Sequence, residues 1–326
     1  MAKPVHFWEV SGFIRISDRA RIEFEEIIKD YGVRKLSRDL TLDRETINSL
    51  YRKGRRKGAH QIECLLQIAK FLNYNLERLE KEITHYGGKQ ANMYEIKFPF
   101  ILTPLYLRAV SIHGDGSFYM DKRTNTIQAE WYQSENRINY MEKLLNKIIK
   151  NNPIKSKIKS KEYGVSSITI PAHFIRLICF SLGLDLKDFH SIEFFKRVSE
   201  LPPNFAFQVF FQFIIDEGHF KGTTLTFSQQ KQWSREGFKI LLNSLNLKHS
   251  DPLNKKQDIT IYGINFPIIL SELNKATNLY GNVAGFWFKE KTFREICERA
   301  EPSLSLRLIK NRIQSNKLKR YAKSNA

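Results

Sequence analysis

The sequence lacks the features that would place a protein in a membrane or outside the cell. No apolar run approaches the roughly 18 residues that a membrane helix needs. The first ten residues do not follow the basic-then-apolar pattern of a signal peptide. The 3 cysteines, Cys64, Cys179 and Cys297, lie far apart without a C-x-x-C pair, which argues against a zinc site and a disulfide framework. We therefore expect a protein of the reducing cytoplasm with no membrane partner.

Acidic residues are also in short supply. The chain has 34 Asp and Glu against 53 Lys and Arg, a formal net charge of +19. Such an excess favours a polyanionic partner, because each phosphate that is neutralised releases condensed counterions. Nucleic acid is thus preferred to an uninvolved basic surface or to a membrane-peripheral role. The last twenty residues contain seven Lys or Arg and no acid, which predicts a mobile basic tail at 307–326.

The length of 326 residues allows two or three domains. The pair Gly87-Gly88 separates two differently patterned regions. Before it, apolar residues recur at helical spacing in two stripes: Ile22, Phe24, Ile27 and Ile28, then Ile62, Leu65, Leu66, Ala69 and Leu72. After it, helix-like and strand-like stretches alternate in an order that occurs twice. We predict an all-α domain at 1–88 and two repeats at 89–200 and 201–306.

The repeat is visible within the chain itself. Residues 105–118 (LYLRAVSIHGDGSF) and 207–220 (FQVFFQFIIDEGHF) each read as an apolar helix that runs into an acid, Gly, a polar residue and Phe. Asp115 and Glu217 occupy matching places in the two copies. Two such copies in one chain predict an α+β fold with pseudo-twofold symmetry, and a monomer.

The downstream elements repeat as well. A strand ending in Gln-rich polar residues follows each acid, at 131–133 and at 227–230, and then an amphipathic helix. Each half later has an Ile-Thr-Ile strand, at 168–170 and 259–261. Each copy is therefore expected to be an α-β-β-α-β-β-α-like unit.

Residues 33–54 carry the spacing of a helix-turn-helix. The small residue Ser37 falls where two helices would touch, and Asp43 is placed to cap the second helix. Ile47 and Leu50 would anchor that helix to a core. The side chains left on its outer face, where a recognition helix meets the major groove, are Arg44, Glu45, Asn48, Ser49 and Arg52.

A basic cluster follows at once: Arg52, Lys53, Arg55, Arg56 and Lys57. Phosphate contacts beside a recognition helix need such a cluster. The segment resembles phage-repressor-type helix-turn-helix domains, which implies DNA contacts from Arg44, Asn48, Arg52, Arg55 and Arg56. The alternative is a plain helical bundle with a solvated basic loop.

The two apolar segments that end in acid-Gly resemble the LAGLIDADG motif of homing endonucleases, over roughly residues 95–300. The resemblance implies that the two motif helices pack along the pseudo-twofold axis and that a saddle of antiparallel strands lies on double-stranded DNA. Asp115 and Glu217 then match the family's metal-binding acids. Mg²⁺ or Mn²⁺ suits this pair, because hard cations prefer carboxylate and water ligands and promote phosphodiester hydrolysis.

Other site residues follow from the same resemblance. Gln133 and Gln230 match a polar position at a strand end that helps to order active-site water. Lys187 fits a basic residue that would stabilise charge on the phosphate. Its partner in the second repeat is either Lys289 or Lys291. A solvated surface role is the alternative for each lysine.

Lysines alternate with other residues along 154–161, at Lys155, Lys157, Lys159 and Lys161. In a strand this spacing puts the ammonium groups on one face, where they can follow DNA phosphates. A disordered basic loop is the alternative.

The second motif departs from the family pattern. Gln212 and Asp216 occupy the helix crossing, where buried polar groups are costly unless paired. An offset that makes Asp216 the ligand is less favoured, because the residues after Gly218 align with those after Gly116. The second hairpin is also shorter, so each of its strands should lose two or three residues.

Taken together, the residues predict a site-specific DNA endonuclease. The alternatives are a non-cleaving DNA-binding transcription regulator on the same fold, and an RNA maturase whose partner is intron RNA. Retention of both acids favours the nuclease.

Overall fold

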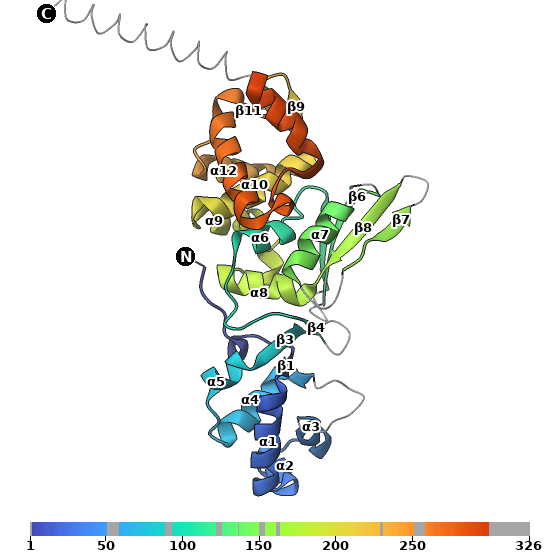
Figure 1. Cartoon of the computed structure of the whole chain (residues 1–326), viewed down its shortest axis with the longest axis vertical. Coiled ribbons are helices and arrows are strands. Elements are labelled where there is room, and N and C mark those ends of the chain that lie inside the picture. Colours follow the sequence, from blue (N-terminus) through green and yellow to red (C-terminus); the bar gives the residue numbers. More distant parts are fainter. Residues whose placement is uncertain are drawn as a thin grey trace, which may run out of the picture.

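The computed structural model describes residues 2–50, 59–88, 93–121, 126–135, 137–149, 154–160, 164–228, 231–250 and 258–299. A front module and two larger parts follow one another along the long axis of the molecule (Figure 1). Within these ranges no helix has the length and apolar character needed to cross a membrane.

The front module combines helices with a small antiparallel sheet. Its helical elements are η1 Phe7–Glu9, α1 Asp18–Tyr31, α2 Val33–Leu40, α3 Arg44–Ser49, α4 Ile62–Phe71 and α5 Leu76–Lys81. Its strands are β1 Phe13–Ile16, β2 His60–Gln61, β3 Ile83–Gly87 and β4 Met93–Tyr94, in the order β2-β1-β3-β4. The prediction of an all-α module is therefore wrong.

The sheet was missed because its strands are short and pair across long stretches of chain. Ile14 of β1 lies opposite Tyr86 of β3, and both side chains are completely buried. A strand of four residues shows little periodicity of its own, and its partner is brought near only by the intervening helices. The sheet also continues to β4, beyond the domain boundary placed at residue 88.

Helices α2 and α3 lie where the helix-turn-helix spacing puts helices. Leu36, Ile47 and Leu50 are buried, and Thr41 adopts the left-handed conformation at the turn. Asp43 occupies the N-cap of α3, although its side chain makes no capping hydrogen bond. Ile22, assigned by the sequence to an apolar stripe, is instead 47% exposed.

The first repeat places helices against a four-stranded antiparallel sheet. The strands are β5 Gly116–Asp121, β6 Thr126–Ser134, β7 Lys157–Ser160 and β8 Val165–Ile170, in the order β5-β6-β8-β7. The helical elements are α6 Pro104–Val110, α7 Asn139–Ile148, α8 Ala172–Leu182, η2 Leu186–Asp188 and α9 Ile192–Ser199. The predicted Ile-Thr-Ile strand is part of β8.

The second repeat has a three-stranded antiparallel sheet. Its strands are β9 Gly218–Lys221, β10 Thr224–Phe227 and β11 Ile259–Tyr262, in the order β11-β10-β9, with an isolated bridge from His249 to Ile261. Its helical elements are α10 Pro203–Glu217, α11 Gln232–Ser244, η3 Gly263–Asn265, α12 Phe266–Tyr280, η4 Asn282–Ala284 and η5 Trp287–Lys289, followed by a helix over 290–299.

The hairpin lengths agree with the sequence. In the first repeat β5 has 6 residues and β6 has 9, whereas β9 and β10 have 4 each. The second hairpin is thus the shorter one, as predicted, although its second strand is 5 residues shorter and not two or three.

The two repeats share one core, in which α6 packs against α10. Every residue of α10 from Ala206 to Ile215 is buried, including Gln208 and Gln212. A helix that is apolar on nearly all sides has no face for solvent, so it must lie at the centre. The chain start is joined to the first repeat, since Val5 forms a bridge with Phe100 and the Lys3 N–H donates to Ser181 O.

Candidate active site

The two motif segments end differently. Helix α10 runs unbroken to Glu217, whereas α6 ends at Val110 and residues 113–115 form a turn before β5. The Ser111 hydroxyl donates to the Leu107 carbonyl at 2.6 Å, and the Ser111 N–H bonds to Arg108 O instead. A side chain that takes the helical acceptor competes with the helix. The prediction of a continuous first motif helix is therefore wrong in its last turn.

Each acid is followed by a glycine for a steric reason. A Cβ on Gly116 would lie 2.3 Å from the Ile112 carbonyl oxygen, and one on Gly218 would lie 2.6 Å from that of Ile214. The strand that leaves each acid turns back so closely over the end of its own motif segment that no side chain fits. Acid-Gly is thus the local pattern that lets a strand start directly at the acid.

Asp115 and Glu217 influence one another across the two repeats. Burial raises the pKa of Asp115, while Lys289 and a hydrogen bond from Gln133 Nε2, at 3.0 Å from Asp115 Oδ2, lower it. Burial also raises the pKa of Glu217, and the negative charge of Asp115 raises it further. Two half-buried carboxylates that repel one another form a site that a cation would stabilise.

Lys289 is the cation whose charge acts to lower the pKa of both acids, and the charge of Lys231 also acts to lower that of Glu217. Its Nζ donates to Ile214 O at 2.8 Å and to Gly218 O at 2.7 Å, on either side of Glu217. Burial lowers the Lys289 pKa to about 8, although the nearby carboxylates of Asp216 and Asp115 act to raise it. Lys291, the other candidate from the sequence, is exposed.

Asp216 is partly buried in the crossing between the repeats, and its Oδ2 atom is enclosed. It accepts a hydrogen bond from Trp131 Nε1 at 3.1 Å and from Gln212 Nε2 at 2.9 Å. Its pKa lies well above the ordinary value because of burial and, next, the charge of Asp115. A Cβ on Gly114 would lie 2.6 Å from Asp216 Cβ, so the residue that faces Asp216 at position 114 must be glycine. The two polar residues that the sequence marks as a departure are therefore hydrogen-bonded to each other, while Gln212 Oε1 is buried without a partner among the described residues.

Trp131 is the site residue that sequence reasoning missed. It lies on β6 opposite Gly116, is completely buried, and reaches from the first repeat to Asp216 of the second. The sequence feature that could have indicated this role is the position of Trp131, two residues before Gln133 in a strand already predicted to follow Asp115.

Lys187 and Gln230 were also expected in the site. Lys187 is exposed, with its ammonium 3.5 Å from the Asp185 carboxylate. Gln230 falls outside the described residues, and so do Arg52, Arg55, Arg56 and Lys161.

Asp115 and Glu217 are the two residues that could hold a metal ion. Within the described ranges, no three His, Cys, Asp or Glu side chains form a complete metal cage. That donor set fits Mg²⁺ or Mn²⁺ as bound through one or two carboxylates, with water and substrate phosphate as the remaining ligands. It does not fit a metal held by protein groups alone.

The basic strand is present but less regular than its spacing suggests. Lys155, Lys157 and Lys159 are exposed, and the latter two lie on β7, the edge of its sheet. The register shifts between Ile158 and Ser160, and Ile158 is 53% exposed. The expected single face of lysines is therefore interrupted by a bulge.

Glu130 adds a negative charge among these lysines. Lys159 Nζ lies 3.0 Å from Glu130 Oε1, and Tyr132 donates to Glu130 Oε2 at 2.7 Å. One of the three lysines is thus partly neutralised by its own sheet.

The predicted recognition helix is exposed in the front module. On α3, Arg44, Glu45 and Ser49 are exposed and Asn48 is partly exposed, while Ile47 points inward. This arrangement leaves Arg44 and Asn48 accessible to a partner.

No protein-family model matches the chain, and no curated protein matches it. Among solved structures the chain is similar to mesophilic variants of the homing endonuclease I-DmoI, at 15% identity over 52% of this chain and 93% of that chain, with a TM-score of 0.36. It is similar to the homing endonuclease I-WcaI bound to its DNA recognition sequence, at 15% identity over 53% and 82%, with a TM-score of 0.34. It is also similar to the LAGLIDADG meganuclease I-AabMI bound to uncleaved DNA, at 14% identity over 63% and 92%, with a TM-score of 0.38. Identities and TM-scores this low assign neither a family nor an activity to the chain.

Proposed function

We propose that the protein is a site-specific endonuclease that hydrolyses phosphodiester bonds of double-stranded DNA, with Mg²⁺ or Mn²⁺ held by Asp115 and Glu217. The observation that carries this proposal is the meeting of these two acids, which lie far apart in the sequence, with Lys289 and Gln133 beside them. The strong basic charge of the chain fits a polyanionic substrate.

The roles of the residues follow from their contacts. A divalent ion between the carboxylates would polarise a phosphoryl oxygen and activate water. Gln133 fixes the Asp115 carboxylate through one amide hydrogen and keeps a second for a water molecule. Lys289, already beside Glu217, would stabilise negative charge on the phosphate. Gln230 is proposed to order water in the second repeat as Gln133 does in the first, and Lys187 is kept as the proposed basic residue of the first repeat.

The two repeats are proposed to be related by a pseudo-twofold axis. In each, an acid is followed by a hairpin, then by a helix and a later strand that pairs with the second strand of the hairpin, β8 with β6 and β11 with β10. Such symmetry would present two similar sheets to the two halves of a DNA site, and one chain would act as a monomer. The division at 1–88, 89–200 and 201–306, with a tail at 307–326, is kept as part of the same proposal.

Recognition is proposed to extend beyond the core. Lys155, Lys157, Lys159 and Lys161 would follow phosphates, and Arg44 and Asn48 of α3 would read the major groove, aided by Arg52, Arg55 and Arg56. Because the second hairpin is short, the front module would lengthen the recognised site.

The test is cleavage of the DNA that flanks the protein's own gene, and of a randomised double-stranded library, with Mg²⁺ or with EDTA. We expect Mg²⁺-dependent cutting that Asp115→Asn and Glu217→Gln abolish. Asp18→Asn and Glu193→Gln, which neutralise exposed acids on α1 and α9, are the matched controls and should cut normally. Binding without cutting would instead indicate a regulator, and selective binding of structured RNA would indicate a maturase.

A further inference from the structure

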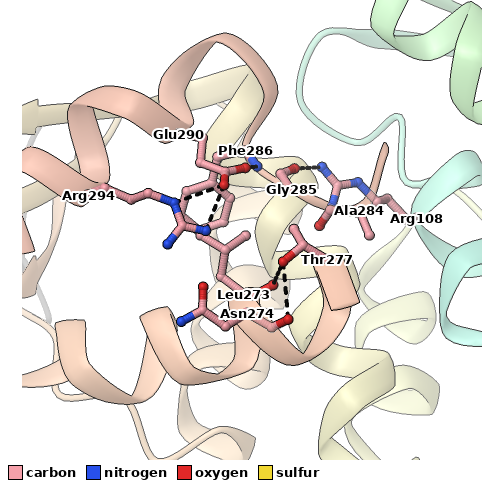
Figure 2. A network of polar contacts seen from close by, with 9 residues as sticks. All are labelled: Arg108, Leu273, Asn274, Thr277, Ala284, Gly285, Phe286, Glu290 and Arg294. Carbon is pink, nitrogen blue, oxygen red and sulfur yellow. Dashed lines mark hydrogen bonds and ion pairs between the residues drawn. The ribbon is translucent and has the colours of Figure 1, made fainter. Parts of the chain in front are cut away.

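The guanidinium of Arg108 is completely buried between the two repeats. It comes from α6 of the first repeat, and its Nη1 and Nη2 donate to the carbonyls of Ala284 and Gly285 in the second. Nη1 also lies 3.3 Å from Gln208 Oε1 on α10. Figure 2 shows the side chain reaching across to the 284–285 carbonyls from a separate part of the chain.

Packing alone does not account for a charge at this position. Burial lowers the Arg108 pKa to about 9, and Nε is buried without a hydrogen-bond partner among the described residues. Apolar side chains of similar volume commonly replace buried charges without loss of stability. What the charge adds here is a pair of bonds to two consecutive carbonyls of one short stretch, residues 284–290, which we name the Lys289 segment.

The Lys289 segment has a strained backbone that its surroundings hold in place. Trp287 has φ 50°, in the left-handed region that non-glycine residues rarely adopt. Its ring stacks on Tyr140 at 5.3 Å between centroids, and the Arg108 guanidinium lies over it at 5.1 Å. Strain of this kind persists only where neighbouring contacts determine it.

The far end of the segment is held by a second cluster. Glu290 Oε2 accepts from the Phe286 N–H at 3.2 Å, and Arg294 Nη2 lies 2.7 Å from Glu290 Oε1 (Figure 2). A Cβ on Gly285 would lie 2.1 Å from Glu290 Oε2, so a larger residue there would displace the Glu290 carboxylate. Lys289 therefore projects from a segment that is clamped on both sides.

We propose that Arg108 is a positioning residue, which holds the Lys289 segment of the second repeat from the first repeat and so places the Lys289 ammonium beside the acids. The segment is otherwise a run of single turns between α12 and the helix over 290–299, with little regular structure to fix a side chain. The effect of Arg108 on DNA cleavage rests on the proposed function, but its effect on the position of Lys289 does not.

The first test measures placement without reference to activity. Wild-type protein and Arg108→Met are treated with limiting acetic anhydride, and labelling of each lysine is followed by mass spectrometry. We expect Lys289 to react about tenfold faster in Arg108→Met, because local opening exposes its amine. Exposed Lys291, close by, is the internal reference and should not change. Equal labelling of Lys289 in both proteins would overturn the proposal.

The matched control is Lys147→Met. Lys147 also donates from the first repeat to a backbone carbonyl of the second, that of Tyr280, but outside the Lys289 segment. It should leave Lys289 labelling unchanged. If both variants raise labelling equally, a general loosening of the interface is indicated and the proposal fails.

The second test concerns cleavage. Arg108→Met should lower the single-turnover rate about 10- to 100-fold with DNA affinity unchanged, as expected for a displaced catalytic group. In a Lys289→Met background the same substitution should cost nothing more, whereas additive losses would show that Arg108 does not act through Lys289.

Glu290→Gln, which keeps the bond to Phe286 N but weakens the pair with Arg294, provides a second variant if Arg108→Met does not fold. It should give a smaller loss of the same kind, and no loss would contradict the clamp. If wild-type protein cuts no DNA, the proposed function fails while the labelling result still decides the placement.

Discussion

Trp131 of the first repeat donates its indole N–H to Asp216 of the second at 3.1 Å. Asp216 also faces Gly114, where an added Cβ would lie 2.6 Å from Asp216 Cβ. One buried contact thus couples the strand that follows Asp115 to the helix that ends at Glu217.

Trp131→Phe should lower the free energy of unfolding by about 1–3 kcal/mol, because it removes a donor from a buried acceptor while keeping an aromatic ring. Urea denaturation monitored by circular dichroism gives the value. Trp233→Phe is the control, since that ring packs against His190 without bonding to Asp216. A loss at position 131 no larger than at position 233 would show that the indole N–H is unimportant.

Gly114→Ala should destabilise the protein by about 1–3 kcal/mol, since the added Cβ would lie 2.6 Å from Asp216 Cβ and the interface would have to shift. Thermal unfolding measures the effect. Asp216→Gly removes the obstructing side chain, so Gly114→Ala should cost much less in that background. The same cost in both backgrounds would place the clash elsewhere.

Stability should fall on acidification through buried histidines. Burial lowers the pKa of His60 to about 4 and that of His190 to about 4, from an ordinary value near 6.5. A group with a depressed pKa binds its proton more readily in the unfolded chain, so the stability present above pH 6.5 is lost as the pH falls from 6.5 to about 4. For His60 the full loss is about 3 kcal/mol.

Urea denaturation at neutral pH and near pH 4.5 tests this dependence. His60→Phe replaces the imidazole with a ring that does not titrate. It should remove the part of the pH dependence of stability that His60 contributes. An unchanged slope in His60→Phe would show that this residue is protonated equally in the folded and unfolded chains.

Divalent metal should bind at the paired acids. Isothermal titration of Mn²⁺ should detect a site in the wild type that Asp115→Asn and Glu217→Gln both weaken strongly, because each removes one of two carboxylate ligands. EDTA should reverse any thermal stabilisation by the metal. Glu193→Gln is the control, and equal binding in all variants would place the metal away from these acids.

The edge lysines should contribute to DNA affinity without setting its sequence. Lys157→Ala should weaken binding to all sequences and lower the salt slope of log K by about 0.9, the change for one phosphate contact. Arg44→Ala should instead reduce discrimination between sites. Lys196→Ala, whose lysine pairs with Glu193, is the control. Fluorescence anisotropy across salt concentrations separates these outcomes, and an unaltered slope for Lys157→Ala would remove β7 from the DNA surface.

Much of the secondary structure was predictable because its pattern is local. The Ile-Thr-Ile strands, the shorter second hairpin and the buried positions of the helix-turn-helix segment all follow from spacing and length within a few tens of residues. Repetition gave the acids Asp115 and Glu217, since two matching acid-Gly ends are visible in one chain.

Contacts between segments far apart in the sequence could not be predicted from such local patterns. The front sheet pairs residues such as Ile14 and Tyr86. Trp131 reaches Asp216 from another repeat, and Lys289 rather than Lys291 arrives at the acids. The local sequence contains equal cations at both positions, and only the folded structure shows that Lys289 is half-buried and Lys291 exposed.

By itself, therefore, the sequence determined the basic charge, the two hairpins and the pair of candidate acids, because charge and periodicity are properties of neighbouring residues. Tertiary structure decided which groups surround those acids and how the first motif helix ends. Those outcomes depend on how buried groups such as Arg108 and Asp216 find partners from the opposite repeat, and desolvation makes partners necessary only once the core has formed.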